Sequence, residues 1–345
     1  MSNNSGATQD SASQDVQLWD AERICRRVAA AEAALSRGFL RCRPEKWFPG
    51  IAGQWLPVSH ALGCEVRVSD IKPILGQPPG GGVVFAGMVS GERMVIGLHE
   101  GSTAALMAEV LPGADGGAWN IVLEYLARRL FFSLASAWSG PELSSVAFLG
   151  PLPSGAIPVA ASVRVAFTIN TTSVTAWFGL GEQLVQTLDG LWRRQVQSAA
   201  RSAAGPASVR LEIAQLGVPP QTLSEYLKQG TVIDLEIRAS ELVTLRVGSR
   251  AWMPGRLLNV EGSFGVEVCP GAVSAPAVPD GTTRLAIEVG SVSMDGSQVA
   301  ELSQAGAILV TNVPIGGEVS LVINQEVVGR ARLCVYEGRF AIEVL

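Results

Sequence analysis

The last part of this chain repeats itself at an offset of 76 residues. The register holds without a gap between residues 209–268 and residues 285–344, and it is clearest over residues 256–268 and 332–344. Self-similarity of this kind indicates two copies of one structural unit, and it constrains the fold more than any local motif. The matched residues that define the repeat are Gly230 and Gly306, Arg256 and Arg332, Glu261 and Glu337, Gly262 and Gly338, and Phe264 and Phe340.

Each copy has the pattern of a small, strand-rich unit. In the first copy a short strand over residues 209–213 and a short helix over residues 222–228 precede Gly230, and alternating apolar strands follow. A unit of about 60 residues buries little apolar surface alone and leaves strand edges free. We therefore expect the two copies to pair with each other. The Pro-rich segment 269–283 is long enough to allow this.

The region before the repeats mixes helical and strand patterns. Apolar residues recur at helical spacing over Val16 to Leu40 and over Trp119 to Trp138, whereas residues 83–98 read as a hairpin and residues 144–178 as strands. This mixture predicts an α+β fold. The predicted organisation is a disordered tail at 1–14, an N-terminal α+β domain at 15–197, a linker at 198–208, the first repeat at 209–268, a Pro-rich linker at 269–283 and the second repeat at 284–345.

Composition excludes several classes of protein. Residues 207–345 carry 10 basic and 15 acidic side chains, which accounts for the net charge of −5. Nucleic-acid binding needs clustered positive charge, so DNA and RNA are not expected partners. The five cysteines have no CxxC spacing, which favours a reducing compartment. Because neither a signal peptide nor a membrane-spanning run is recognisable, we expect a cytoplasmic protein with no direct membrane insertion.

Side chains for catalysis or metal binding are not grouped in the sequence. The only histidines, His60 and His99, lie far apart and have no cysteine or histidine at ligand spacing. No Gly-x-Ser-x-Gly motif occurs. The repeated acids Glu261 and Glu337 open a Glu-Gly turn, which favours a structural role. We predict no catalytic residues, no cofactor, no metal site and no enzymatic activity.

The repeat has a family resemblance. Its strand, helix and glycine, followed by strands closing on Arg-Leu-x-x-x-Glu-Gly-x-Phe-x-Val-Glu-Val, resemble the SpoA domain of flagellar switch proteins and their type III secretion counterparts. Residues 319–331 resemble a strand pair of the flagellar switch protein, except that Gln325 stands where that family often has Gly. Tandem copies behind a larger mixed domain are similar to the SctQ family, also called HrcQ, YscQ or SpaO. The N-terminal region is similar in element order to the flagellar switch middle domain.

This resemblance implies a non-enzymatic scaffold. The expected role is that of a subunit of the cytoplasmic sorting platform, or C-ring, of a bacterial type III secretion apparatus. The implied partners are the SctL-family stator protein of the export ATPase, the SctK-family adaptor, chaperone–effector complexes, and either a second copy or a separately translated C-terminal SpoA fragment. Two alternatives remain open: a flagellar motor switch protein, and a CheC-like acyl-phosphate phosphatase. For the phosphatase the chain offers only Asn120 and Glu124, without a second copy of that pair.

The two copies differ most around residues 252–254. Trp252, Met253 and Pro254 stand where the second copy has Val328, Gly329 and Arg330. Large apolar side chains at a strand edge either fill the core or anchor a partner. The predicted partner-binding residues are Leu235, Ile237, Trp252 and Met253.

Overall fold

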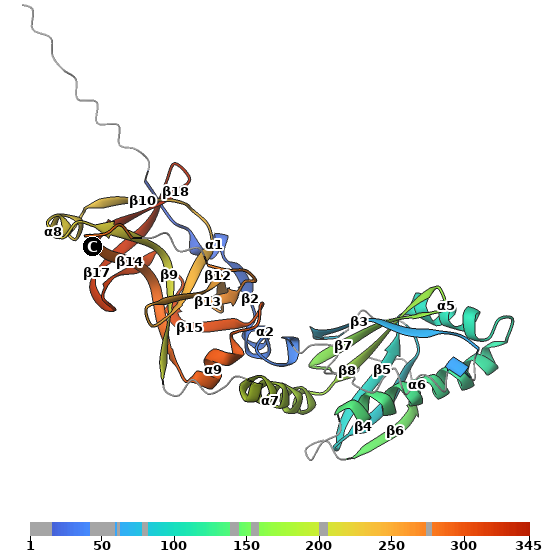
Figure 1. Ribbon diagram of the computed structural model, residues 1–345. Helices are drawn as coiled ribbons and strands as arrows, with labels where there is room; N and C mark the ends of the chain where they lie inside the picture. Colours follow the sequence, from blue (N-terminus) through green and yellow to red (C-terminus); the bar gives the residue numbers. More distant parts are fainter. Residues whose placement is uncertain are drawn as a thin grey trace, which may run out of the picture. The chain divides into compact units, whose positions relative to one another are not determined.

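Figure 1 shows the computed structural model of the chain, which divides into two compact units. One unit comprises residues 34–201, and the other joins residues 1–33 to residues 202–345. The predicted tail at residues 1–14 lies outside the described residues, as do parts of both predicted linkers. None of the described helices is long and apolar enough to cross a membrane. The structure describes residues 16–41, 59–60, 63–77, 82–138, 145–152, 159–199, 206–273 and 278–345.

The unit of residues 34–201 is built on an antiparallel sheet with the strand order β3-β7-β8-β5-β4-β6. The strands are β3 (Val66–Leu75), β4 (Val84–Val89), β5 (Glu92–Leu98), β6 (Val146–Pro151), β7 (Ala161–Ile169) and β8 (Thr172–Leu180). The helical elements are the 3-10 turn η1 (Phe39–Arg41) and the helices α5 (Glu100–Val110), α6 (Gly116–Trp138) and α7 (Glu182–Ala199). The predicted α+β class is confirmed, including the hairpin at residues 83–98.

Apolar stripes on the helices form the core of this unit. Leu123, Leu126 and Leu130 of α6 are buried with side chains of the sheet, as the helical spacing over residues 119–138 predicted. The close approach of α6 depends on Gly87 of β4, because a Cβ there would lie 2.3 Å from the ring of Phe131. Any side chain at position 87 would require the Phe131 ring to shift.

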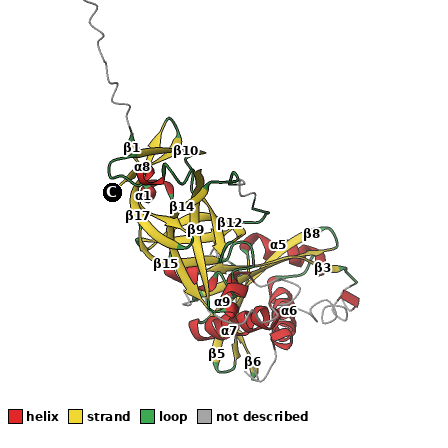
Figure 2. Ribbon diagram, turned by 60° about the vertical axis from the view of Figure 1, so that its left-hand side comes forward, coloured by secondary structure: helices red, strands yellow, loops and turns green. Residues whose placement is uncertain are grey.

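The other unit consists mainly of strands (Figure 2). Its sheet has the order β10-β18-β17-β16-β14-β9-β11-β12-β13-β15, with β1 added to β17 and β2 added to β12. The strands are β1 (Gln17–Leu18), β2 (Arg26–Val28), β9 (Ala207–Val218), β10 (Val232–Arg238), β11 (Leu242–Val247), β12 (Arg250–Val260), β13 (Ser263–Val268), β14 (Thr283–Met294), β15 (Ile308–Pro314), β16 (Glu318–Ile323), β17 (Glu326–Tyr336) and β18 (Arg339–Val344). The helices are α1 (Ala21–Ile24), α2 (Ala30–Leu35), which continues into the first unit, α8 (Leu223–Tyr226) and α9 (Gly296–Glu301).

The two repeats are related by a pseudo-two-fold axis between β9 and β14. These strands are equivalent in the two copies, they run antiparallel, and Glu212 lies directly opposite its equivalent Glu288. Strands that meet their own equivalents in this way are the mark of an isologous contact. The predicted pairing of the copies is thus observed, with one sheet running through both.

The copies also exchange strands. β10 of the first copy pairs with β18 of the second, and β15 of the second copy pairs with β13 of the first. The repeated glycines hold these pairings: the Gly230 N–H donates to Val344 O at 2.8 Å, and the Gly306 N–H donates to Val268 O at 2.7 Å. Each copy therefore lacks an edge partner for its closing strand until the other copy supplies one.

Both closing hairpins use the same turn. Glu261 and Gly262 have φ of 51° and 88°, and Glu337 and Gly338 have 48° and 75°. Positive φ at both central residues defines the type I′ turn that suits a two-residue hairpin. Gln325, the departure noted in the sequence, likewise has φ of 73°. The turn type therefore persists without Gly at that position.

The prediction of one helix over Val16 to Leu40 is wrong. That segment forms β1, α1, β2, α2 and η1 in succession. Of the apolar residues in that pattern, Trp19 and Val28 are buried against the repeats, whereas Leu18 and Ile24 are exposed. Tertiary contacts thus override local helical preference. Residues 1–33, which the sequence assigned to the N-terminal domain from residue 15, belong to the unit of the repeats.

Candidate interaction surface

The segment Gln17–Val28, which we call the N-terminal strap, runs along equivalent edges of the two repeats. β1 pairs antiparallel with β17 at Val335 and Cys334, and β2 pairs parallel with β12 at residues 258–260. Cys334 and Leu258 are equivalent positions at the offset of 76 residues. A single segment therefore covers the same edge in both copies. It is antiparallel to one and parallel to the other because the pseudo-two-fold axis reverses the strand direction.

Trp19 anchors the strap between the two repeated phenylalanines. Its ring is stacked on Phe264, with centroids 6.4 Å apart and planes 7° apart, and it meets the edge of Phe340 at 5.6 Å and 78°. The backbone N–H of Trp19 donates to the backbone oxygen of Leu333 at 3.1 Å, and only 3% of the residue is exposed. Both ring arrangements are geometries that aromatic pairs favour. The phenylalanines that define the repeat thus form a site for one aromatic side chain.

The repeated arginines are not equivalent in their ion pairs. Arg332 pairs with Glu343 across β17 and β18 at 3.3 Å. Arg256 instead pairs with Glu241 at 3.4 Å.

The strap contacts Glu267, the acid that lies opposite Arg256 on the neighbouring strand. Glu267, the equivalent of Glu343, lies 3.7 Å from Arg26 of the strap. The turn residue Glu261 also accepts a hydrogen bond from the Ala30 N–H at 3.1 Å, where α2 begins. The strap therefore distinguishes the two copies, although it covers equivalent edges of both.

A buried charge cluster lies at the pseudo-two-fold axis. Glu212 accepts from Arg246 at 3.3 Å and also from Arg284, while Glu288 pairs with Arg210 at 3.2 Å. The two carboxylates and the guanidiniums of Arg210 and Arg246 belong to residues that are less than a tenth exposed. Carbonyl oxygens complete the cluster, because Arg246 donates to Ser249 O at 2.6 Å and Arg210 donates to Gly248 O.

The cluster is asymmetric. The second copy has Ala286 and Val322 at the positions of Arg210 and Arg246, so two of the three arginines come from the first copy. Burial raises the pKa of Glu288, and although Arg210 opposes that effect, the net direction is upward. Burial likewise lowers the pKa of Arg246. The repetition of Glu212 as Glu288 is visible in the sequence at the offset of 76 residues, but no local signal marks their arginine partners, because Arg210 and Arg246 lie among apolar residues inside strands.

We expect the stability of Glu288→Gln, relative to the wild type, to increase as the pH rises. A carboxyl whose folded-state pKa is raised contributes stability below its unfolded pKa, about 4.3, and loses it as the pH rises through the folded pKa. The amide removes that loss, so the difference in unfolding free energy between variant and wild type should grow as the pH rises above about 4.3. Urea titrations between acid and neutral pH measure it. A difference that shrinks with rising pH would contradict the argument.

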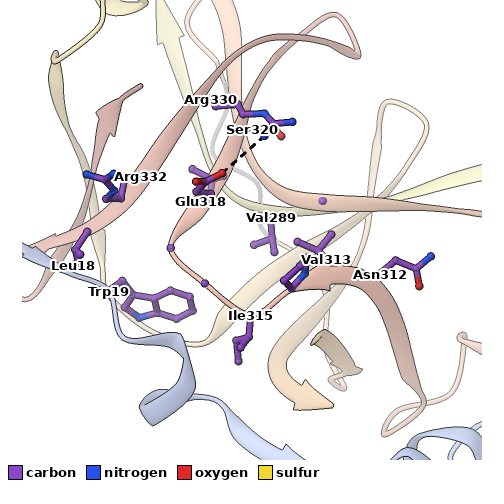
Figure 3. Close-up of a pocket in the computed structure, with 15 residues that line it drawn as sticks. Leu18, Trp19, Val289, Asn312, Val313, Ile315, Glu318, Ser320, Arg330 and Arg332 are labelled. Atoms are coloured by element: carbon purple, nitrogen blue, oxygen red, sulfur yellow. Dashed lines mark ion pairs between the residues drawn. The ribbon is translucent and has the colours of Figure 1, made fainter. Parts of the chain in front are cut away.

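A cavity of about 710 Å³ opens beside the strap (Figure 3). Leu18 and Trp19 form one wall, and β14 to β17 of the second copy form the rest. Arg330 and Glu318, which pair at 3.9 Å, give it a polar margin. Its other lining residues are Val289, Gly290, Asn312, Val313, Pro314, Ile315, Gly316, Gly317, Val319, Ser320 and Arg332.

The predicted partner-binding residues lie at or near the core. Leu235 is 3% exposed, which leaves no side-chain surface for a partner. Ile237, Trp252 and Met253 are half-buried and pack against the core cluster of the repeats. A role in partner contact remains a prediction for these three. The cavity lies on the second copy. Val313, one of the residues that line it, is the equivalent of Ile237 in the first copy.

The residues considered for phosphatase chemistry lie on α6 of the other unit. Asn120 is exposed, and Glu124 pairs with Arg128 one turn further along the helix at 3.2 Å. An exposed pair of this kind is ordinary surface electrostatics. Among the described residues no group of three or more His, Cys, Asp or Glu side chains could hold a metal ion.

Comparison with known proteins identifies the repeats. Residues 206–269 and 280–345 each match the family described as type III flagellar switch regulator (C-ring), FliN C-terminal domain. The C-terminal region is therefore a tandem of this domain, the SpoA domain of the sequence analysis, and the boundaries agree with the observed repeats. No curated protein matches the chain.

Solved structures give weaker likenesses. The FliM middle domain from H. pylori is 9% identical and aligns over 47% of this chain and 99% of its own, with a TM-score of 0.35. A putative chemotaxis protein from Desulfovibrio vulgaris Hildenborough is 13% identical over 39% of this chain and 95% of its own, with a TM-score of 0.28. A CheC-like superfamily protein from Shewanella sp. PV-4 is 10% identical over 40% and 98%, also with a TM-score of 0.28.

Proposed function

We propose that this protein is a non-enzymatic scaffold subunit of the cytoplasmic sorting platform, or C-ring, of a bacterial type III secretion apparatus. The observation that carries the proposal is the presence in one chain of two C-ring switch-regulator domains, joined by exchanged strands into a built-in heterodimer. Such a pair presents a surface that neither copy would present alone. A surface of that kind suits a protein that holds several partners in a fixed assembly.

The proposed partners are those implied by the resemblance. The SctL-family stator protein of the export ATPase would bind the paired repeats, the SctK-family adaptor would bind the N-terminal domain, and chaperone–effector complexes would dock on the assembled platform. Self-association or a separately translated C-terminal SpoA fragment would add further copies. Recognition of a helical or extended segment fits the cavity beside the strap, which is lined by both apolar and polar side chains.

Co-purification tests the proposal. The tagged full-length chain is expressed with candidate stator, adaptor and chaperone proteins encoded beside it, and we expect the stator-like protein to be retained. Trp252→Ala and Met253→Ala test the predicted contact residues, with the exposed Leu149→Ala on the other unit as matched control. Failure of the wild-type chain to retain a stator-like protein would remove the proposal.

A flagellar motor switch protein is the second candidate, because the matched family is described as a flagellar switch regulator. Retention of flagellar basal-body proteins in place of secretion proteins in the same experiment would favour it. An acyl-phosphate phosphatase is the third. Hydrolysis of an acyl phosphate that is lost in both Asn120→Ala and Glu124→Ala would contradict the purely structural role.

A further inference from the structure

The strap pairs with the sheet only over short stretches. β1 and β2 contribute two and three residues of strand pairing, and the side chains of Leu18 and Ile24 point outward, with 62% and 45% of the residues exposed. Four of its residues, Trp19, Ala21, Cys25 and Val28, are buried, and Trp19 has the largest side chain among them. A segment with one large aromatic anchor and short strand pairing at each end has the features of a bound extended peptide.

The groove that receives the strap is larger than the strap. The cavity of about 710 Å³ lies directly beside Leu18 and Trp19, so part of the site is left open. The indole N–H of Trp19 is buried and has no hydrogen-bond partner among the residues that the structure describes. An unsatisfied buried donor is costly, which lowers the stability of the strap in this position.

We propose that the groove between the two repeats is a peptide-binding site, and that the strap is a tethered occupant which can be replaced by the strap of a second copy of this chain. A peptide that binds this site needs an aromatic side chain to lie between Phe264 and Phe340, and a main chain that can pair first with β17 and then with β12. It also needs a cationic side chain close to Glu267.

Residues 17–28 of the chain itself meet all of these requirements, in the right order and spacing. A second copy therefore supplies the best-matched competitor. Exchange of identical elements between protomers needs no new contact chemistry. The inference depends on the strap and its groove and not on the secretion role proposed above.

A labelled peptide of residues 16–29 tests the groove. It is titrated into the full-length wild-type chain and into Trp19→Ala, with fluorescence anisotropy as the readout. The wild-type strap competes at the millimolar effective concentration of a tethered ligand. Removing the anchor should weaken that competition, so the variant should bind the peptide about 30-fold more tightly than the wild type does. Ile24→Ala, which alters an exposed strap residue, should behave as wild type.

Two results would overturn the proposal. A folded Trp19→Ala chain that does not bind the peptide, or that binds a peptide with Trp replaced by Ala equally well, removes the aromatic site. Light scattering of wild type mixed with Trp19→Ala should show a two-chain species that grows with concentration. Its absence removes the second copy as the occupant.

If Trp19→Ala does not fold, hydrogen exchange on the wild-type chain tests whether the strap leaves the groove. Strap amides, including that of Trp19, should exchange well before those of β9 and β14 at the centre of the sheet. Equal protection of strap and central strands would show that the strap is a fixed part of the fold, and would overturn the proposal.

Discussion

Replacing Glu212 with alanine should lower the unfolding free energy of the repeat unit by about 3–5 kcal/mol. The carboxylate accepts from Arg246 and Arg284, and it is 3% exposed. Without it, Arg246 remains buried with no carboxylate in contact, and burial already lowers the pKa of that guanidinium. Equilibrium unfolding in guanidinium chloride, followed by circular dichroism, measures the loss.

Glu343→Ala is the matched control. Glu343 forms an ion pair with Arg332 in the same unit, at 3.3 Å, but both side chains are about two fifths exposed. Solvent screens such a pair, and its removal should cost less than about 1 kcal/mol. Equal losses for the two variants would show that burial does not decide the strength of the cluster.

The sequence predicted the features that repetition and periodicity encode. The offset of 76 residues gave both copies with their boundaries, and the repeated Glu261-Gly262 turn has the same geometry as Glu337-Gly338. The pairing of the copies followed from physical size, since a unit of about 60 residues has unsatisfied edges. In the N-terminal domain the stripe along α6 was equally readable.

Features that join distant segments were not predictable in this way. The strap was predicted to be part of a helix because apolar residues from Val16 to Leu40 recur at helix-like spacing, and nothing local shows that Phe264 and Phe340 receive Trp19. The exchange of β10 and β15 between copies is similarly invisible, since the same strands would satisfy a closed copy.

The buried charge cluster shows a different limit. Arg210 and Glu212 flank Leu211 within β9, a pattern typical of a strand with one solvated face. Both are buried at the centre of the sheet, where β9 lies between β11 and β14 and their charges meet those of Arg246, Arg284 and Glu288. A strand's place in the sheet, and so the burial of its polar face, depends on long-range pairing.

Phe340→Ala should also cost about 3–5 kcal/mol of unfolding free energy. The residue is 1% exposed, and the centroid of its ring lies 5.6 Å from that of Trp19. Truncation therefore opens a cavity where the strap packs against the repeats. The measurement is again equilibrium unfolding, and Val327→Ala, at a 63% exposed position on β17, is the control expected to change little.

A double-mutant cycle with Trp19→Ala then separates the strap from the core. If the two rings interact as a pair, the cycle should return a coupling of about 0.5–1.5 kcal/mol. A coupling near zero would mean that Phe340 stabilises the repeats without the strap. In that case the strap could leave the groove at no cost to Phe340. A positive coupling would instead show that the strap stabilises the repeats through the contact between Trp19 and Phe340.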